Sequence, residues 1–460
     1  MLAGETSATP VTYARRLGLF SGTMAVVGGI IGSGIFLNPR YVAQRMYSSP
    51  ERILGAWVVG GVIALLGAFC YAELGHRRPR AGGGYVYLRD AFGPLPAFLY
   101  GWALLFLIAT GACAAVAVTC ATYTAALLGL PDGIVAPLAV VLIALLSAVN
   151  YVGVRPAAWT QNVFTLLKLG ALALLIVVAL VYAIPSAPQI TMPGGAVERW
   201  SPPASPTPLF FALGTSLVPI LFAYGGWQQT NFIAEEIVDA ERTLPKALLL
   251  GTGIVVAVYL LGNFAYLRIL GMQGLALSGA PAADLMGATV GMGGRRLISL
   301  GIACSTFGFL NLVILVSPRV YQTMAADGVF FPALARLHPT YRTPGLAILV
   351  QGAWAILLTL TKGYGPLLDY VVFGDWIFFG LTAASLFVYR RRGESGGSFR
   401  VPGYPLTPLL FCAAAVYVVV SSVASNPKNA AIGAALLLAG IPVFLYWKGR
   451  RTADGGRQKG

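Results

Sequence analysis

The sequence predicts an all-α membrane protein with about twelve transmembrane helices, from its composition and its apolar segments. Of the 460 residues, 57% are hydrophobic and only 10% are charged, whereas a soluble domain carries about 25% charged residues. About twelve segments hold roughly 18 or more predominantly apolar residues, enough for a helix to cross a hydrocarbon core about 30 Å thick. Apolar blocks of about 20 residues are typical of helices and not of the shorter, alternating strands of membrane β-barrels.

The apolar segments follow one another along most of the chain. They cover residues 18–44, 53–75, 94–128, 134–153, 159–184, 206–235, 245–270, 298–324, 344–361, 366–389, 406–425 and 430–447. No cleavable signal peptide is expected, because the first apolar run is too long and lacks a small-residue cleavage site.

The net charge of +15 indicates membrane orientation and not nucleic-acid binding. If the N-terminus is cytoplasmic and the chain crosses twelve times, most of the 31 Lys and Arg residues fall on the inner side, as in the clusters 77–80 and 390–392. This positive-inside bias predicts that both termini are cytoplasmic. Anionic lipid is a further expected partner of these basic loops.

Two of the predicted spans are interrupted by glycines, and they lie five spans apart. The first contains GGIIGSG at 28–34 and the sixth contains FAYGGWQQTN at 222–231. Paired interrupted helices are typical of transporters built from inverted repeats, and an odd number of spans inverts the second repeat. We therefore expect five parts: a cytoplasmic segment 1–17, a first repeat 18–184, a second repeat 206–389, spans 11 and 12 at 406–447, and a cytoplasmic tail 448–460.

These interruptions predict a polar site at mid-membrane. Unwound backbone has unsatisfied N–H and C=O groups, which are tolerated only where they face protein or a water-filled cavity. N–H groups that begin the second half-helix suit a carboxylate, and here they belong to Gly32, Ser33 and Gly34. Freed carbonyls suit an ammonium group, and here they belong to Ile30, Ile31, Phe222 and Ala223. Together the two sets describe an α-amino acid. Taken alone, Gly28 and Gly32 also form GxxxG, a helix-packing motif.

Longer motifs carry a resemblance to a known family. YAELGHRRPRAGGGYVYLRDAFG at 71–93 resembles the span 2–3 signature of the amino acid–polyamine–organocation (APC) superfamily. GSGIF at 32–36 and FAYGGWQQTNFIAEEI at 222–237 resemble its L-amino acid transporter (LAT) branch. The resemblance covers roughly residues 15–445. It implies a LeuT-like fold with alternating access around broken helices 1 and 6, and a plasma-membrane permease or antiporter for L-amino acids.

The resemblance also implies roles for single residues. It assigns the substrate carboxylate to the backbone of Gly32, Ser33 and Gly34. It assigns the surroundings of the substrate amine to Ile30, Phe222, Ala223 and Gly225, and makes Phe222 an aromatic gate over the bound substrate.

Lys168 lies near the middle of the fifth span, where a lysine costs at least ~2.5 kcal/mol on insertion scales. Snorkelling relieves this cost mainly near helix ends. The resemblance implies that the ammonium replaces a sodium ion that ties span 1 to spans 5 and 8 in relatives. A proton-coupling role is the alternative, and the sequence leaves both open.

Two further residues are candidates for the side-chain pocket. The resemblance places Asp375 beside the substrate side chain, where an animal member has asparagine, so a carboxylate there would favour cationic or polar substrates. The alternative is an aspartate paired with a backbone N–H or another helix. Phe309 corresponds to a small residue in that relative and would shrink the pocket.

Other functional classes have weaker support. There is no Walker A motif for ATP-driven pumping, and no HExxH motif or nucleophile with a base for an intramembrane enzyme. The open alternatives are a proton-coupled carrier for cationic amino acids or polyamines, and a channel or receptor.

No cofactor is expected, and no metal site, because His76 and His338 stand alone in loops. The five cysteines all fall in predicted spans, so no disulfide framework is implied. Animal LAT members join a glycoprotein through a cysteine in the outer loop after span 3. Loop 128–137 has none, so no disulfide-linked heavy subunit is expected.

Overall fold

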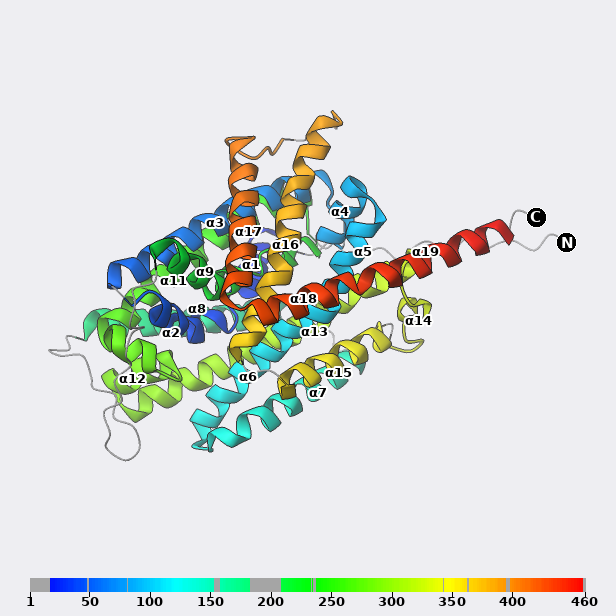
Figure 1. Cartoon of the computed structure of the whole chain (residues 1–460). Helices are drawn as coiled ribbons and strands as arrows, with labels where there is room; N and C mark the ends of the chain where they lie inside the picture. The colour runs from blue at the N-terminus through cyan, green and yellow to red at the C-terminus, as the bar shows by residue number, and fades with distance from the viewer. Residues whose placement is uncertain are drawn as a thin grey trace.

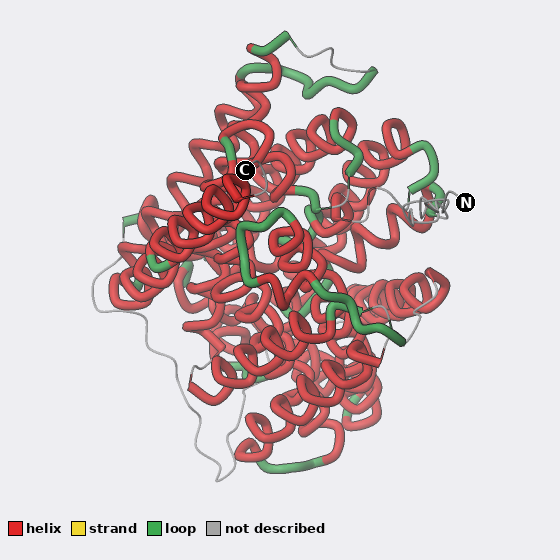
Figure 2. Tube along the Cα trace, turned by 90° about the vertical axis from the view of Figure 1, so that its right-hand side faces the viewer, coloured by secondary structure: helices red, strands yellow, loops and turns green. Residues whose placement is uncertain are grey.

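The computed structural model describes residues 17–47, 49–80, 82–152, 158–182, 208–232, 234, 237–341, 343–361, 364–393 and 398–457. Regular structure in this part of the chain is helical (Figure 2), apart from one parallel bridge between Leu17 and Ile237. The predicted segment 1–17, except Leu17, and the boundaries at 184 and 206 lie outside the described residues.

Apart from α4 and the short turn η2, the helices of the first half fit the predicted apolar segments. They are α1 (Leu19–Ile30), α2 (Gly34–Arg45), α3 (Pro50–Arg77), α4 (Gly84–Phe92), α5 (Pro94–Ala103), the π-helix η1 (Leu104–Ile108), α6 (Ala109–Leu128), the short 3₁₀ turn η2 (Asp132–Ile134), α7 (Val135–Val152) and α8 (Ala158–Val181).

The second half adds two long helices and several shorter ones. They are α9 (Leu209–Tyr224), α10 (Gln229–Phe232), α11 (Ala240–Leu277), α12 (Pro281–Val290), α13 (Met292–Ala326), α14 (Pro332–Ala335), α15 (Gly345–Thr361), α16 (Tyr364–Arg391), α17 (Leu406–Ser425), α18 (Pro427–Leu438) and α19 (Gly440–Arg457).

An all-helical membrane protein is confirmed. Within the described residues, nine helices are long and apolar enough to cross a membrane, or ten if α1 and α2, which bend by 42° at their break, form one span. The apolar helices α9 and α15 are shorter, with 16 and 17 residues. Several details differ from the expected spans. A π-helix interrupts the segment 94–128, the segment 430–447 is divided between α18 and α19, and α19 continues past residue 447 to Arg457.

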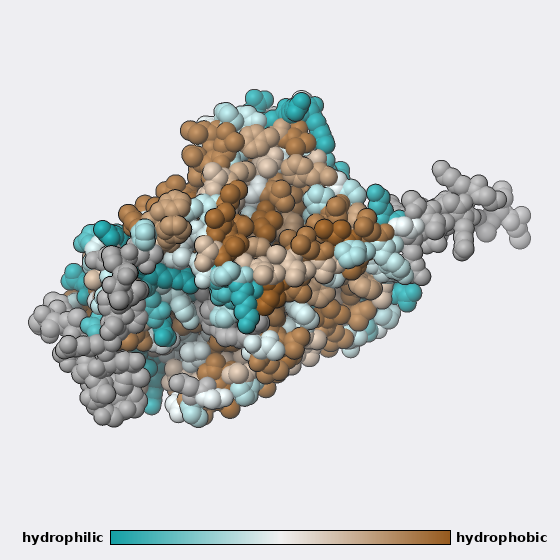
Figure 3. Space-filling view, in the orientation of Figure 1, coloured by the Kyte–Doolittle hydropathy of each residue, from teal (hydrophilic) through white to brown (hydrophobic). Residues whose placement is uncertain are grey.

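The outer surface fits a lipid environment. Figure 3 shows hydrophobic side chains over the middle of the face formed by α16, α17 and α18, and hydrophilic ones at the upper end, where α16 ends in Figure 1. Large apolar side chains on α17 and α19 are exposed, including Leu409, Val416, Val420 and Leu445. Contact with acyl chains explains why these residues need no protein partner.

A buried carboxylate joins the ends of α3 and α16. Glu73 is fully buried, and its oxygens lie 2.7 Å from Arg77 Nη2 and 2.5 Å from Arg390 Nη2. The N–H of Val401 also donates to Glu73 Oε2 at 2.7 Å. This network ties together helix ends that lie more than three hundred positions apart in sequence. It occupies the end of the molecule where the sequence predicts the cytoplasm.

Candidate substrate-binding site

The two interrupted helices touch each other at their breaks. α1 ends at Ile30 and α2 begins at Gly34, while α9 ends at Tyr224 and α10 begins at Gln229. A Cβ on Gly34 would lie 2.6 Å from the Ala223 Cβ. Gly226 has φ +117°, and a Cβ there would overlap the Gly29 carbonyl oxygen. Glycine therefore allows close approach of two main chains, in addition to interrupting the helices.

The start of α2 presents unpaired backbone donors. The first N–H groups of a helix have no intrahelical acceptor, and Ser33 provides no side-chain cap. Among the described residues, the N–H groups of Ser33, Gly34 and Ile35 have no acceptor. The N–H of Gly32 instead donates to the Ile30 carbonyl at 2.8 Å. Donors of this kind, at the positive end of the helix dipole, suit an anion.

The end of α9 presents unpaired carbonyls. The last four carbonyls of a helix lack intrahelical donors, and no external donor to those of Phe222, Ala223 or Tyr224 is found within the described residues. The N–H of Gly226 turns away and donates to Gln228 Oε1 at 2.9 Å. This end of the second break therefore suits a cation.

The carbonyls of the first break are already engaged. The Ile30 carbonyl also accepts from Tyr259 Oη at 3.2 Å. Lys168 is 1% exposed, and its Nζ donates to the carbonyls of Gly28 at 3.1 Å and Ile31 at 3.0 Å. The ammonium also lies 5.4 Å from the centre of the Phe309 ring. Lys168 thus ties α8 to the break between α1 and α2.

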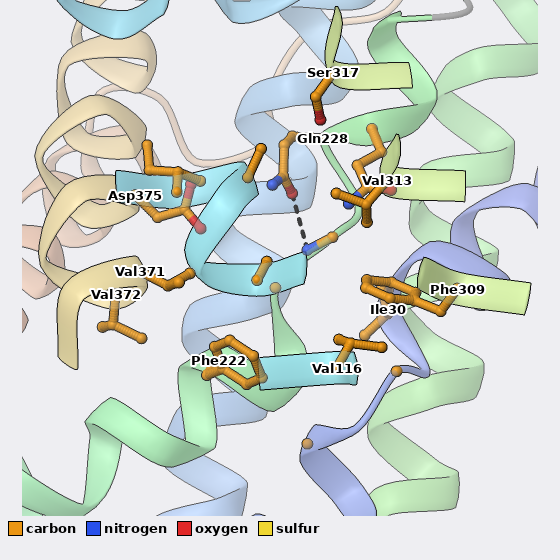
Figure 4. Close-up of a pocket in the computed structure, with 18 of the residues that line it drawn as sticks. Ile30, Val116, Phe222, Gln228, Phe309, Val313, Ser317, Val371, Val372 and Asp375 are labelled. Atoms are coloured by element: carbon orange, nitrogen blue, oxygen red, sulfur yellow. Dashed lines mark hydrogen bonds between the residues drawn. The ribbon is translucent and has the colours of Figure 1, made fainter. Parts of the chain in front are cut away.

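A cavity lies against both breaks (Figure 4), bounded by α1–α2, η1–α6, α9–α10, α13 and α16. It encloses about 730 Å³ of space between atoms, part of it open to solvent. Eight of the predicted site residues line it: Ile30, Gly32, Ser33, Gly34, Phe222, Gly225, Phe309 and Asp375. Three do not: Ile31, whose carbonyl binds Lys168; Ala223, which packs against Gly34; and Lys168 itself.

Sequence reasoning missed one wall of the cavity and part of its polar lining. Leu104, Ile108 and Ala109 line the cavity from the π-helix and the start of α6. π-Helical turns occur frequently at functional sites, but no glycine or proline falls within Leu104–Ile108 to signal one. Gln228, which also lines the cavity, falls inside the interrupted motif 222–231 and could have been found there.

Asp375 reaches the cavity from α16. Figure 4 shows its carboxylate on the α16 side, with Gln228 and Ser317 across the cavity from it. Val371, one helical turn away, also lines the cavity. Asp375 has no hydrogen-bond or ion-pair partner among the described residues. The sequence left open that Asp375 is paired with a backbone N–H or with another helix. Neither pairing is found among the described residues.

Comparison with known proteins decides the family. A family model described as an amino acid permease matches residues 17–446. The chain belongs to the amino acid permease family.

Individual relatives agree with this assignment over most of the chain. The human large neutral amino acids transporter small subunit 2 is 33% identical over 463 residues, covering 97% of this chain and 84% of the human protein. The serine/threonine exchanger SteT of Bacillus subtilis is 30% identical over 444 residues, 95% of this chain and 98% of SteT. The human b(0,+)-type amino acid transporter 1 is 32% identical over 419 residues, 90% of this chain and 83% of that transporter.

The resemblance to the APC superfamily and its LAT branch is thereby confirmed, and so is the interpretation of the chain as a transporter and not an enzyme. This permease is a multi-pass membrane protein for amino acid transport.

Proposed function

We propose that this permease exchanges L-amino acids across the plasma membrane by alternating access, using a LeuT-like fold of twelve spans. In this arrangement spans 1–5 and 6–10 form inverted repeats, with spans 1 and 6 interrupted. The proposal is supported by breaks at 31–33 and 225–228, five predicted spans apart. SteT is named an exchanger, which agrees with an antiport mechanism.

The observation that carries the proposal is the juxtaposition of opposite main-chain dipoles at one cavity. Ser33 and Gly34, whose N–H groups lack an acceptor among the described residues, and Phe222, whose carbonyl lacks a donor there, all line one cavity. An α-amino acid carries a carboxylate and an ammonium on the same carbon, so both of its charges would be neutralised without any charged side chain of the protein.

The proposed roles follow from which groups are free. The carboxylate binds the N–H groups of Ser33 and Gly34. Gly32 lies beside the Phe309 ring, whose nearest atoms are 3.5 Å from an ideal Gly32 Cβ. The ammonium binds the carbonyls of Phe222 and Ala223, near Gly225. The carbonyls of Ile30 and Ile31, predicted to bind the ammonium, carry other hydrogen bonds in this conformation. The Phe222 ring serves as the gate over the substrate, and Lys168 takes the place of a tethering cation.

Topology and partners complete the proposal. The excess of Lys and Arg in the predicted inner loops supports cytoplasmic termini. The human relative of 33% identity is named a small subunit, but loop 128–137 of this chain has no cysteine for a covalent partner. We therefore propose a permease that works without a disulfide-linked heavy subunit.

Counterflow in proteoliposomes tests the exchange. Purified full-length protein is reconstituted with a high internal concentration of unlabelled amino acid, and uptake of the labelled amino acid is followed with and without a pH gradient. Saturable, trans-stimulated uptake is expected. Uptake that requires the pH gradient and ignores internal substrate would indicate a proton-coupled carrier instead. Ion current without saturable amino acid flux would indicate a channel, and binding without flux a receptor.

A further inference from the structure

Asp375 places a carboxyl group in the cavity, and an ordinary zwitterion brings no additional cation to pair with it. The main-chain donors of α2 and acceptors of α9 match the two charges of an α-amino acid, as proposed above. Asp375 adds a third charged group on α16, directed into the same cavity (Figure 4). A carboxylate at this depth is costly unless a cation or hydrogen-bond donor faces it.

The described part of the chain supplies no cation to meet this carboxylate. Among the described residues that line the cavity, none is Lys, Arg or His. Lys168 is separate from the cavity lining, and its Nζ is held by the carbonyls of Gly28 and Ile31. Within the described residues, a counter-charge for an ionised Asp375 is therefore absent, and a ligand that enters the cavity can supply it.

We infer that the preferred substrate is an L-amino acid with a cationic side chain, and that Asp375 forms its ion pair. The inference rests on the proposed function and names its substrate class. Arginine, lysine and ornithine have the required charge pattern: one carboxylate, one α-ammonium and one cation at the end of an aliphatic stem.

The shape of the cavity fits such a stem. Val371 and Val372 line the cavity within one helical turn of Asp375, and Val116 and Phe309 line the opposite part of its wall (Figure 4). Methylene groups pack against these apolar side chains, while the cationic end lies near Asp375. Neutral donors such as the Gln228 amide, across the cavity, provide further polar lining without competing for the carboxylate as a charge.

Two other ligand classes fit less well. A neutral aliphatic amino acid leaves the Asp375 carboxylate without a counter-charge, which disfavours its binding. A diamine such as putrescine neutralises Asp375 but has no carboxylate for the N–H groups of Ser33 and Gly34.

Competitive uptake by the full-length permease in proteoliposomes tests the inference. Labelled L-lysine and L-leucine are compared in the wild type, Asp375→Asn and Asp375→Glu, with putrescine as a competitor. The wild type and Asp375→Glu are expected to prefer lysine over leucine. In Asp375→Asn this preference should fall by about ten-fold or more, because a desolvated ion pair becomes an uncompensated cation. Putrescine should not compete.

Asp369→Asn is the matched control. Asp369 lies on the same helix, and its carboxylate accepts from Asn426 Nδ2 at 3.1 Å, outside the residues that line the cavity. This variant should keep the lysine preference of the wild type. Size-exclusion profiles in detergent show that each variant is folded, and a lysine-induced rise in the melting temperature of the wild type provides a measurement independent of Asp375 variants.

The outcomes separate the inference from the proposed function. Leucine exchange by a wild type that neither transports nor is stabilised by lysine or arginine would overturn the inference alone. So would an unchanged lysine-to-leucine ratio in Asp375→Asn, including the case in which this variant loses only a pH-gradient dependence and Asp375 acts as a proton carrier. Putrescine transport equal to that of lysine would overturn the claim that the substrate needs a carboxylate. Absence of exchange with every amino acid would overturn both.

Discussion

Lys168 and Asp375 are both ionisable residues within membrane helices, but their surroundings differ. Lys168 is 1% exposed, and its ammonium donates to two carbonyls of the α1–α2 break and lies over the Phe309 ring. Asp375 lines the cavity and has no hydrogen-bond or ion-pair partner in the described part of the chain. One charge is satisfied by the protein, and the other is open to whatever enters.

This difference indicates two roles for an ionisable residue within a membrane helix. A charge in a membrane helix costs several kcal/mol unless it is compensated. Where main-chain dipoles compensate it, as at Lys168, the charge holds an unwound backbone segment in place. Where no group in the described part of the chain compensates it, as at Asp375, the inferred binding of a complementary ligand would remove the cost and make the charge a source of specificity. Changes at Lys168 should therefore affect all substrates alike, and changes at Asp375 should affect the choice among them.

Gly34→Val should have the largest effect, because it disrupts the main chain that Lys168 is inferred to hold in position. A side chain at this position collides with Ala223, so the two breaks would be forced apart and counterflow of every amino acid should be abolished. Gly170→Val is the control, since a Cβ at Gly170 meets no atom within 4 Å. Measurable uptake by Gly34→Val would contradict the assignment of the carboxylate to this backbone.

Lys168→Met should come next. Two buried carbonyls would lose their donor, each at a cost of about 1–3 kcal/mol, so uptake should fall by about ten-fold or more for lysine and leucine equally. Initial rates of uptake measure the effect. Lys246→Met, at an exposed lysine of α11, serves as the control and should behave as the wild type. A change in the lysine-to-leucine ratio in Lys168→Met would break the contrast with Asp375.

Phe309→Leu should have a moderate effect. The ring lines the cavity between the Gly32 backbone and the Lys168 ammonium, and a cation–π contact contributes about 0.5–2 kcal/mol. We expect KM to rise a few-fold for all substrates, with the lysine preference unchanged. Saturation kinetics with each substrate distinguish this result from the effect of a larger pocket. A larger pocket would lower KM for bulky substrates alone.

Glu73→Gln should have the smallest effect on transport and a larger one on stability. Like Lys168, Glu73 is fully engaged by the protein, through Arg77, Arg390 and the N–H of Val401. Loss of one partner of a buried charge network costs about 3 kcal/mol, so the melting temperature in detergent should fall. The lysine-to-leucine ratio should stay unchanged. An altered lysine-to-leucine ratio in a Glu73→Gln variant of normal melting temperature would contradict the view that a charge engaged by the protein does not affect substrate choice.

Much of the fold could be predicted because its signals are local. Runs of apolar residues specify helices in lipid without reference to distant parts of the chain. Glycine clusters at 28–34 and 225–226 likewise locate both breaks, since they weaken the helix wherever it packs. The π-helix at Leu104–Ile108 was missed because nothing in its five apolar residues distinguishes it from the α-helix around it.

The site was only partly predictable, because each assignment of a free donor or acceptor depends on a distant partner. The sequence indicates that Ile31 has a freed carbonyl, but not that Lys168, 137 positions away, takes it. It likewise indicates a freed N–H at Gly32, which in the structure donates locally to Ile30. A group can bind substrate only if no other part of the protein already binds it. Which groups meet this condition is known only from the packing of all the helices.

By itself, the sequence determined that the chain is a helical membrane protein, where two of its helices are interrupted, and that two costly charges lie within its spans. Only the tertiary structure decided which charge is satisfied, because hydrogen bonds and ion pairs join groups from different helices. The approach of α8 to the first break engages Lys168, while the packing of α16 against the cavity leaves Asp375 without a partner among the described residues.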